Sequence, residues 1–527
     1  MNYRSSKFSV SVILHFTDSY SADLNAFARI LDSILNQSLP VHEIILLNQG
    51  EELLLTKEIQ SVPVKVLQGE YRNLAEWLNA GWQASEGDYL LYLANISAEI
   101  QLKQAYLEAA YLSVIKHPRL GMLYADYELS GGNGVKEIRL LKHHAGRLRD
   151  NQDYGLVFLF SDAALMEVNG FDASIQSDNN VLYDIRLKLS EKYEIIHIAN
   201  KTGGALYRVI AEGQRADVFD YLIAQKELQL EAERVLSNHL KRIGAYLRPG
   251  YGYRARPKSN RQYDYQASVV IPVNNRPEFI KIALSSVFAQ TIKNIEAIVV
   301  VNGGRSDSTA TEVAKYLPGG SLYTEKNPPV RLIVSDINNI GLSLNLGIEK
   351  ASGRYYVQLD SDDRLKPDAI AKVIELFESD ERIGIVIGSY EVWEQKSSGE
   401  LIRMTKIPVV KHDEWTDENG RNNLLRINGA GAPRCIPIEI IQEMGYFGIN
   451  DEPYACNYGE DYDMVLKISE KYKVGRIYDP IYEVIRHAGG TDHRIDQSTI
   501  DRNDEAKDYI RLLTLQRRIL LNRSRTK

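Results

Sequence analysis

Short apolar segments alternate with amphipathic segments along the second half of the chain. Residues 267–273, 295–301 and 330–334 are rich in β-branched side chains, which is typical of buried strands. Residues 278–290 and 342–351 instead carry apolar side chains at the spacing of a helix. This alternation predicts an α/β fold, with a mainly parallel sheet and helices on both faces.

A further apolar run, residues 355–359, ends in three acids: Asp360, Asp362 and Asp363. Open α/β sheets bind ligands at the edge where the parallel strands end. Clustered carboxylates repel one another unless a cation neutralises them, and their oxygen atoms suit Mg²⁺ or Mn²⁺. The alternative interpretation is an acidic turn that caps a helix starting near Pro367.

The apolar pattern occurs twice, which predicts an internal duplication. Three pairs of segments match in the same order: 11–14 with 268–271, 43–47 with 296–300, and 187–193 with 466–472. The chain then divides into residues 1–215, a first copy; 216–266, a helix and a linker rich in Arg and Tyr; 267–500, a second copy; and 501–527, a basic C-terminal helix.

Charge and composition limit the class of protein. The 527 residues are 44% hydrophobic and carry a net charge of −7, which argues against general nucleic-acid binding and favours a packed linker over a polyanion site. Cys435 and Cys456 are the only cysteines and suggest no disulfide framework, as in a reducing compartment. Without a signal peptide or a spanning stretch in the sequence, we expect a cytoplasmic protein.

The C-terminal segment 511–527 contains six basic residues and no acid, interleaved with leucine and isoleucine. Such a pattern fits a basic amphipathic helix that makes a peripheral contact with the inner face of a membrane. It equally fits a helix docked on its own domain with a frayed basic end.

Residues 265–495 resemble the inverting nucleotide-sugar glycosyltransferases of family 2. The resemblance rests on these motifs: Ser268–Pro272, Asn339–Gly341 with Asn345, Leu359–Asp363, Gly459–Asp463 and Arg486–His487. It implies two GT-A-like (nucleotide-diphospho-sugar transferase) domains, each a mainly parallel sheet flanked by helices. The first copy with its helix and linker resembles tandem glycosyltransferases of bacterial surface-polysaccharide pathways.

The resemblance also implies roles for individual residues. Asp360, Asp362 and His487 would hold Mn²⁺ or Mg²⁺, Asp461 would be the general base, and Glu460 would assist it. Residues expected at the nucleotide-sugar donor are Pro272, Asn274, Arg276, Asn302, Asn345 and Asp360. The alternatives are exposed charges at a helix start for Asp461 and an ordinary histidine for His487, with His493 as a competing ligand.

Some positions depart from the family pattern. Asn274 stands where an aromatic residue is common, Val301 and Asn302 where one or two aspartates are common, and Leu344 where arginine is common. The nucleobase therefore cannot be assumed to be uracil. Small residues in the segment 428–434 permit close approach of sugar or acceptor, or form a simple loop.

The first copy has lost the acids of the second. Aligning Gly87 with Gly353 places residues 94–97, Ala-Asn-Ile-Ser, opposite Asp360 to Asp363, and the later repeat places Val181 and Leu182 opposite Glu460 and Asp461. This predicts a degenerate copy that stabilises the chain, binds an acceptor glycan or holds a partner. A metal-independent second transferase is the alternative.

Together these features predict a metal-dependent inverting glycosyltransferase that moves a sugar from a nucleotide-sugar donor to a glycan or lipid-linked acceptor. One alternative is a non-catalytic binding protein with two inactive copies. Another is a nucleotidyltransferase, although residues 302–305, Asn-Gly-Gly-Arg, are a poor substitute for a triphosphate-binding loop.

Overall fold

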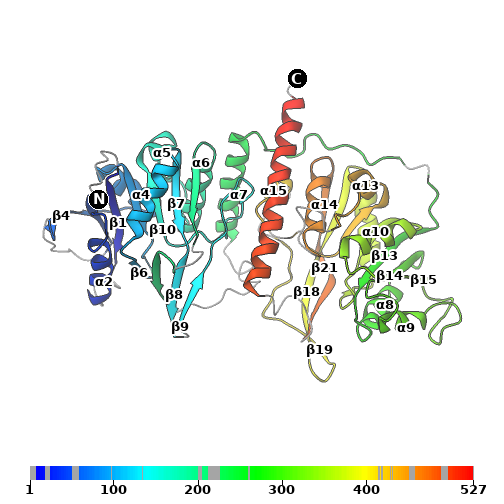
Figure 1. Cartoon of the computed structure of the whole chain (residues 1–527). Coiled ribbons are helices and arrows are strands. Elements are labelled where there is room, and N and C mark those ends of the chain that lie inside the picture. Colours follow the sequence, from blue (N-terminus) through cyan, green and yellow to red (C-terminus); the bar gives the residue numbers. More distant parts are fainter. Residues whose placement is uncertain are drawn as a thin grey trace. The chain divides into compact units, whose positions relative to one another are not determined.

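The structure is a computed structural model. It describes residues 8–17, 24–49, 58–96, 98–132, 134–199, 204–211, 226–258, 261–412, 416, 419–427, 429, 431–449, 457–487 and 496–525. The chain forms two compact units (Figure 1): unit 1 contains residues 1–217 and 231–239, and unit 2 contains residues 218–230 and 240–527. His493 and the first residues of the linker helix lie outside the described residues.

Unit 1 is built on an eight-stranded sheet. Its strands are β1 (Val10–Phe16), β2 (Glu43–Asn48), β3 (Glu58–Ile59), β4 (Val62–Gln68), β5 (Tyr89–Leu93), β7 (Leu120–Ala125), β10 (Val157–Ser161) and β11 (Glu194–Ile198). Their order is β11-β7-β10-β5-β1-β2-β4-β3. A second sheet, in the order β6-β12-β8-β9, contains β6 (Glu99–Leu102), β8 (Tyr127–Gly131), β9 (Gly134–Ile138) and β12 (Tyr207–Ile210).

The helices of unit 1 connect successive strands. They are α2 (Leu24–Leu35), α3 (Leu74–Ala84), α4 (Tyr106–Lys116), α5 (Asp162–Glu167) and α6 (Asp178–Ser190). The boundary between the units passes through α7 (Lys226–Arg242).

Unit 2 contains a nine-stranded sheet. The strands are β13 (Tyr265–Val273), β14 (Ile295–Val301), β15 (Val330–Val334), β16 (Gly353–Gln358), β17 (Arg364–Leu365), β18 (Ile383–Gln395), β19 (Leu401–Arg403), β20 (Arg434–Pro437) and β21 (Lys473–Arg486). Their order is β15-β14-β13-β16-β20-β18-β21-β17, with β19 paired to β18. The strands expected at 295–301 and 330–334 are confirmed, as is the α/β fold class.

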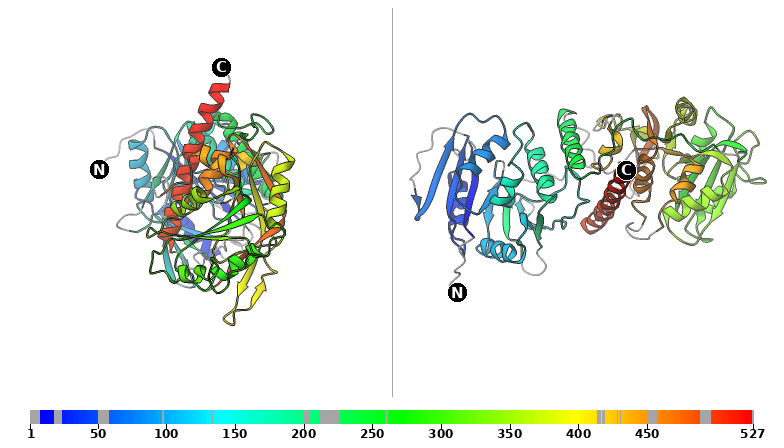
Figure 2. Two further views of the ribbon diagram at one scale, coloured as in Figure 1. Left: turned by 90° about the vertical axis from the view of Figure 1, so that its right-hand side faces the viewer. Right: turned by 90° about the horizontal axis from the view of Figure 1, so that it is seen from above.

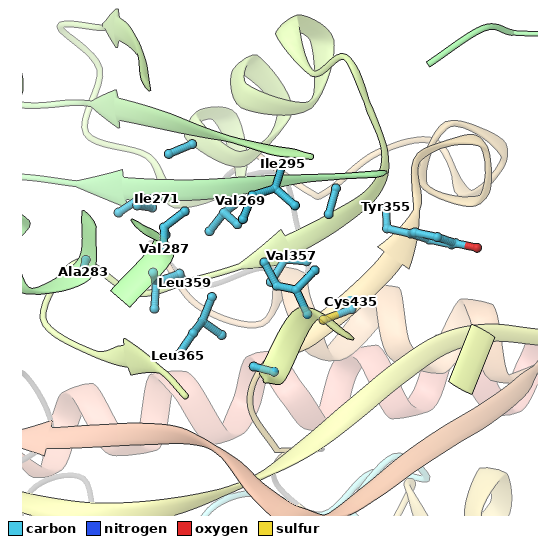
Figure 3. Packing of buried hydrophobic residues seen from close by; sticks show 14 of the residues in the cluster. Val269, Ile271, Ala283, Val287, Ile295, Tyr355, Val357, Leu359, Leu365 and Cys435 are labelled. Carbon is cyan, nitrogen blue, oxygen red and sulfur yellow. The ribbon is translucent and has the colours of Figure 1, made fainter. Parts of the chain in front are cut away.

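The helices of unit 2 are α8 (Ile280–Phe288), α9 (Ser308–Ala314), α10 (Ile340–Lys350), α11 (Ala369–Ser379), α12 (Gly420–Asn423), α13 (Ile438–Met444), α14 (Glu460–Ser469) and α15 (Gln497–Arg525). The helix α10 packs on β13 and β14, and α11 packs on β18 and β21. Figure 3 shows the core under the sheet, where Val269 and Val357 meet Leu359 and Leu365.

Seven strands have the same order and the same directions in the two units. In unit 1 the order is β4-β2-β1-β5-β10-β7-β11, and in unit 2 it is β15-β14-β13-β16-β20-β18-β21. The fifth strand of each set, β10 or β20, runs antiparallel to both neighbours. The sheets of both units thus end in an equivalent edge, where the first four strands finish in parallel.

A buried hydrogen-bond cluster joins the first strand to its neighbours in each unit, near the amino ends of these strands. In unit 1, Ser11 Oγ donates to Glu43 (2.7 Å) and accepts from the backbone N–H of Gly87 (2.9 Å). In unit 2, the same bonds join Ser268 to Glu296 (2.7 Å) and to Gly353 (2.9 Å). The serine ties the first strand to its two neighbours, because the three partners lie in or beside different strands.

The helix α15, red in Figures 1 and 2, lies against its own unit. Arg511 and Arg518 are fully buried and donate to the backbone oxygens of Ile427 (2.8 Å) and Arg421 (2.7 Å). These contacts support the docked-helix alternative for this stretch of the basic segment. Among the described residues, we find no helix that is both long enough and apolar enough to cross a membrane.

Candidate functional site

The acids that follow β16 lie beside the end of β21. The Oδ2 atom of Asp362 is 3.0 Å from Nε2 of His487, the residue directly after β21. The guanidinium of Arg276 contacts both, at 3.0 Å from Asp362 and 3.1 Å from His487. The ring of Phe279 packs on the imidazole with centroids 4.2 Å apart. The fold therefore joins three residues that the sequence assigned to donor and metal binding.

Tyr482 in β21 fixes the turn that carries the acids. Its hydroxyl accepts a hydrogen bond from the backbone N–H of Asp360 (3.1 Å). Asp363 is buried and accepts from the backbone N–H of Ile485 (2.8 Å). Asp363 thus anchors the turn to β21, whereas Asp360 and Asp362 remain partly exposed.

The second pair of acids, Glu460 and Asp461, begins α14. Gly459 precedes them with a φ of 102°, a left-handed conformation that favours glycine. The side chain of Glu460 points into a buried environment with 7% of the residue exposed, and the side chain of Asp461 is 28% exposed. The abrupt helix start gives two adjacent acids different surroundings.

Arg434, the first residue of β20, connects the two acidic groups. Its guanidinium forms an ion pair with Asp461 (3.0 Å) and donates to Oε1 of Gln358 at the end of β16 (3.4 Å). A third bond, to the carbonyl of Gly431 (2.9 Å), fixes the side chain from the preceding loop. Gly431 has a φ of 103°, so glycine suits this turn.

The charges at the site shift the acids in opposite directions. Burial and the neighbouring charge of Asp362 raise the pKa of Asp360, although Arg434 counteracts this shift. Burial and the charge of Asp461 raise the pKa of Glu460 to about 7. Burial also opposes the ionisation of Asp461, but the positive charges of Arg434 and Lys507 outweigh it, so its pKa lies below the ordinary value. Asp461 is therefore the ionised member of the pair.

The residues around Asp362 fit a divalent cation by their chemistry. A carboxylate oxygen and an imidazole nitrogen 3.0 Å apart share the cationic guanidinium of Arg276 as a neighbour. The raised pKa values of Asp360 and Asp363, caused by burial and by mutual repulsion, also indicate negative charge in need of compensation. Within the described residues, no group of three or more His, Cys, Asp or Glu side chains is arranged as a metal centre.

Of the remaining predicted donor residues, three lie at the ends of strands and Asn345 lies within α10. Pro272 is in β13, and Asn274 directly follows that strand. Asn302, 5% exposed, donates to Ser343 Oγ (2.9 Å), and its Oδ1 atom is buried without a hydrogen-bond partner. Asn345 exchanges two hydrogen bonds with the backbone of Phe447 (2.9 and 3.0 Å). That pairing gives Asn345 a structural contact that the sequence did not indicate.

The sequence analysis assigned no role to four residues that contact or influence the site. Arg434 and Tyr482 hold the acids, Phe279 packs on His487, and Lys507 of α15 acts on Asp461. Of these four, Arg434 alone had a signal in the sequence, because it directly follows the Gly-Ala-Pro segment. The C-terminal helix, predicted as a separate part, thus contributes a charge to the site.

The corresponding edge of unit 1 carries different side chains. Asn95 is fully buried and exchanges two hydrogen bonds of 2.9 Å with the backbone of His15 in β1. Ile96 and Leu182 occupy the positions aligned with Asp362 and Asp461. The edge keeps the strand order of unit 2 but has no acids at these aligned positions.

Comparison with known proteins finds similarity to glycosyltransferases. Residues 268–427 match the sequence model of the glycosyl transferase family 2. An uncharacterized glycosyltransferase of Rickettsia conorii is 30% identical over 211 residues, which cover 39% of this chain and 32% of the relative. One of Rickettsia prowazekii is 28% identical over 270 residues, covering 50% and 77%. The chondroitin synthase of Pasteurella multocida is 33% identical over 224 residues, covering 42% and 21%.

The chain thus spans about a third of the length of the Rickettsia conorii relative. Among solved structures, Staphylococcus aureus TarS 1–349 in complex with UDP-GlcNAc has a TM-score of 0.34 and 16% sequence identity, and the alignment covers 44% of this chain and 61% of that one.

Proposed function

The chain carries a glycosyl transferase family 2 domain over residues 268–427, and we propose that the protein is a metal-dependent inverting glycosyltransferase. It transfers a sugar from a nucleotide-sugar donor to a glycan or lipid-linked acceptor. Its place is in the biosynthesis of a bacterial surface polysaccharide, which agrees with relatives from bacteria, one of them named a chondroitin synthase. Unit 1 is a degenerate copy of unit 2.

The position of Arg434 carries this proposal. Its guanidinium contacts Asp461 directly and lies close enough to Asp360 to affect that residue's pKa. Two acidic groups that are far apart in the sequence therefore belong to one site. Such a site has a carboxylate for the acceptor and carboxylates for the donor, as transfer with inversion requires.

The chain's own residues divide the work of the reaction. Asp461 takes the proton from the acceptor hydroxyl as the acceptor oxygen attacks the anomeric carbon, and the nucleoside diphosphate leaves from the opposite face. Asp360, Asp362 and His487 would hold the cation, which would supply positive charge for the leaving diphosphate. Arg434 keeps Asp461 ionised, and Arg276 contacts the diphosphate.

Asn302 lies at the carboxyl end of β14, with a buried and unpaired Oδ1 atom. In the proposed enzyme this atom accepts a hydrogen bond from the nucleobase. A peripheral contact with membrane lipid, suited to a lipid-linked acceptor, is placed at the end of α15, where Leu520 and Arg523 are exposed.

The test is product analysis with a panel of nucleotide sugars, in Mn²⁺ and in EDTA. Metal-dependent release of a free nucleoside diphosphate, with a glycoside of inverted anomeric configuration by NMR, is the expected result. Pyrophosphate would instead identify a nucleotidyltransferase. Release of neither product, with saturable nucleotide binding, would identify a binding protein.

A further inference from the structure

Unit 1 contains a cleft of about 650 Å³ at the carboxyl edge of its sheet. Its wall is formed by the ends of β2 and β4, the start of α3, and Ile96 after β5. A cleft of this size accommodates a small organic ligand. We propose that it binds an uncharged saccharide without a metal ion. The proposal concerns unit 1 and does not depend on the transfer reaction proposed for unit 2.

The cleft does not offer the chemistry that a metal–diphosphate complex requires. Ile96 lines it at the position aligned with the acid Asp362 of unit 2. The adjacent Asn95 cannot turn toward a ligand without losing both of its hydrogen bonds to the backbone of His15. An aliphatic side chain is not a metal ligand, so Ile96 cannot take the part that Asp362 is expected to play in unit 2.

The charges of the cleft also oppose an anionic ligand. Among the described residues that line it, Arg72 is the one cation, and its Nε atom binds the carboxylate of Glu76 (2.8 Å). Glu70 and Asp178 add two carboxyl groups to the wall. A nucleoside diphosphate would meet these acids with the positive charge already paired, which disfavours its binding.

The helix α3 offers little attraction to an anion either. Asn73, its N-cap residue, accepts a hydrogen bond from the backbone N–H of Glu76 (3.0 Å). The Glu76 carboxylate in turn accepts from the backbone N–H of Arg72 (2.9 Å). The Asn73 side chain thus caps the helix, and the Glu76 carboxylate places a negative charge in its first turn, which disfavours an anion there.

The polar groups that remain are those suited to sugar hydroxyls. Gln49 and Gln68 bring exposed carboxamides to the wall, and each carboxamide can both donate and accept a hydrogen bond. Tyr71 and Trp77 add aromatic surface, with ring centroids 4.3 Å apart. Amides beside aromatic rings match a ligand with hydroxyls along its rim and C–H groups on its faces.

Saturation-transfer NMR on the full-length protein in EDTA tests the proposal. The probes are the methyl glycosides of glucose, galactose, mannose and N-acetylglucosamine. We expect saturable transfer to at least one glycoside, unchanged by adding Mn²⁺. Gln49 and Gln68 are exposed, so the double variant Gln49→Ala/Gln68→Ala should fold normally and bind that glycoside at least about tenfold more weakly, as expected for the loss of two hydrogen bonds.

The variant Asp362→Asn is the matched control, because it changes the edge of unit 2 alone. Glycoside binding should be unaffected by it, and Mn²⁺-dependent nucleotide binding should be unaffected by the double glutamine variant. No transfer to any of the four glycosides would overturn the proposal. Saturation transfer to a glycoside that persists in the double variant would also overturn it. So would saturable nucleotide binding that the double variant abolishes.

Discussion

The two sheets share the same buried hydrogen bonds and carry different chemistry at their carboxyl edges. Near the amino ends of the strands, Ser11 and Ser268 make equivalent bonds to a buried glutamate and to a glycine N–H in or beside the neighbouring strand. At the carboxyl edge, unit 2 places Asp362 beside His487, whereas unit 1 places Ile96 in the wall of a cleft. A fold can thus be kept by buried hydrogen bonds while the site above it changes, because the two depend on different side chains.

The largest expected effect compares Asp461 in α14 with the aligned Leu182 in α6. Asp461→Asn keeps the size of the side chain but cannot accept the proton, so transfer should fall by about a hundred- to ten-thousand-fold while donor binding persists. The matched change in unit 1, Leu182→Ala, should leave transfer within about twofold, since aligned acids alone carry the reaction. Steady-state kinetics and donor titration measure both, and near-normal turnover of Asp461→Asn would move the base elsewhere, first to Glu460.

The next effect separates the two strand ends. Asp362→Asn removes a charged ligand and should weaken Mn²⁺-dependent nucleotide binding by about a hundredfold. Ile96→Asn, at the aligned position of unit 1, should leave that affinity unchanged. Calorimetric titration with nucleoside diphosphate and Mn²⁺ gives the comparison. Unchanged affinity in the Asp362 variant would refute its assignment as a metal ligand.

The third prediction concerns Arg434, which connects the two acidic groups. Arg434→Met removes the positive charge next to Asp461, which should raise the pKa of Asp461 and lower transfer by about ten- to a hundredfold. The acidic limb of the kcat/KM profile should move to higher pH, because Asp461 then protonates at higher pH. Arg434→Lys keeps a positive charge, so its kcat/KM profile should shift less than that of Arg434→Met. A profile that stays in place would mean that Arg434 does not act through Asp461.

At the aligned pair Glu460 and Val181, an effect of pH on stability is expected in unit 2 alone. Burial and Asp461 raise the pKa of Glu460 to about 7 in the folded state. A raised folded-state pKa gives stability that is complete below the ordinary carboxyl pKa and is lost as the pH rises through about 7. Glu460→Gln should remove this loss, which amounts to at most about 3 kcal/mol.

Urea unfolding of both forms between about pH 5 and pH 8 measures this difference. The aligned residue of unit 1, Val181, carries no titratable group, so Val181→Ala should leave the pH dependence unchanged. Parallel pH profiles for wild type and Glu460→Gln would contradict the assignment.

The smallest effects should be the same in both units. Ser11→Ala and Ser268→Ala each leave a glycine N–H without its partner and remove one hydrogen bond of a buried glutamate oxygen, which keeps its bond from a backbone N–H. Each change should lower the free energy of unfolding by about 1–3 kcal/mol. Chemical unfolding measures the loss of stability in each variant. A clear difference between the two losses would show that the cluster does not stabilise the two units equally.

Much of the scaffold could be predicted from local patterns alone. The strand 295–301 was predicted at its observed bounds, and the acids Asp360 and Asp362 were correctly expected to follow a buried strand. Periodicity carries this information because burial on one or both faces of an element selects apolar residues at fixed spacing. The repeated order of matching segments likewise predicted two copies, and the shared strand order supports that proposal.

The sequence by itself determined which residues stand at strand ends and helix starts, since these depend on a few neighbours along the chain. Only the tertiary structure decided which of them meet. It paired Asp461 with Arg434, brought Lys507 from the C-terminal helix to the same acid, and engaged Asn345 with the backbone of Phe447. Such contacts join residues far apart in sequence, and charge and hydrogen bonding act through space, so no local pattern records them.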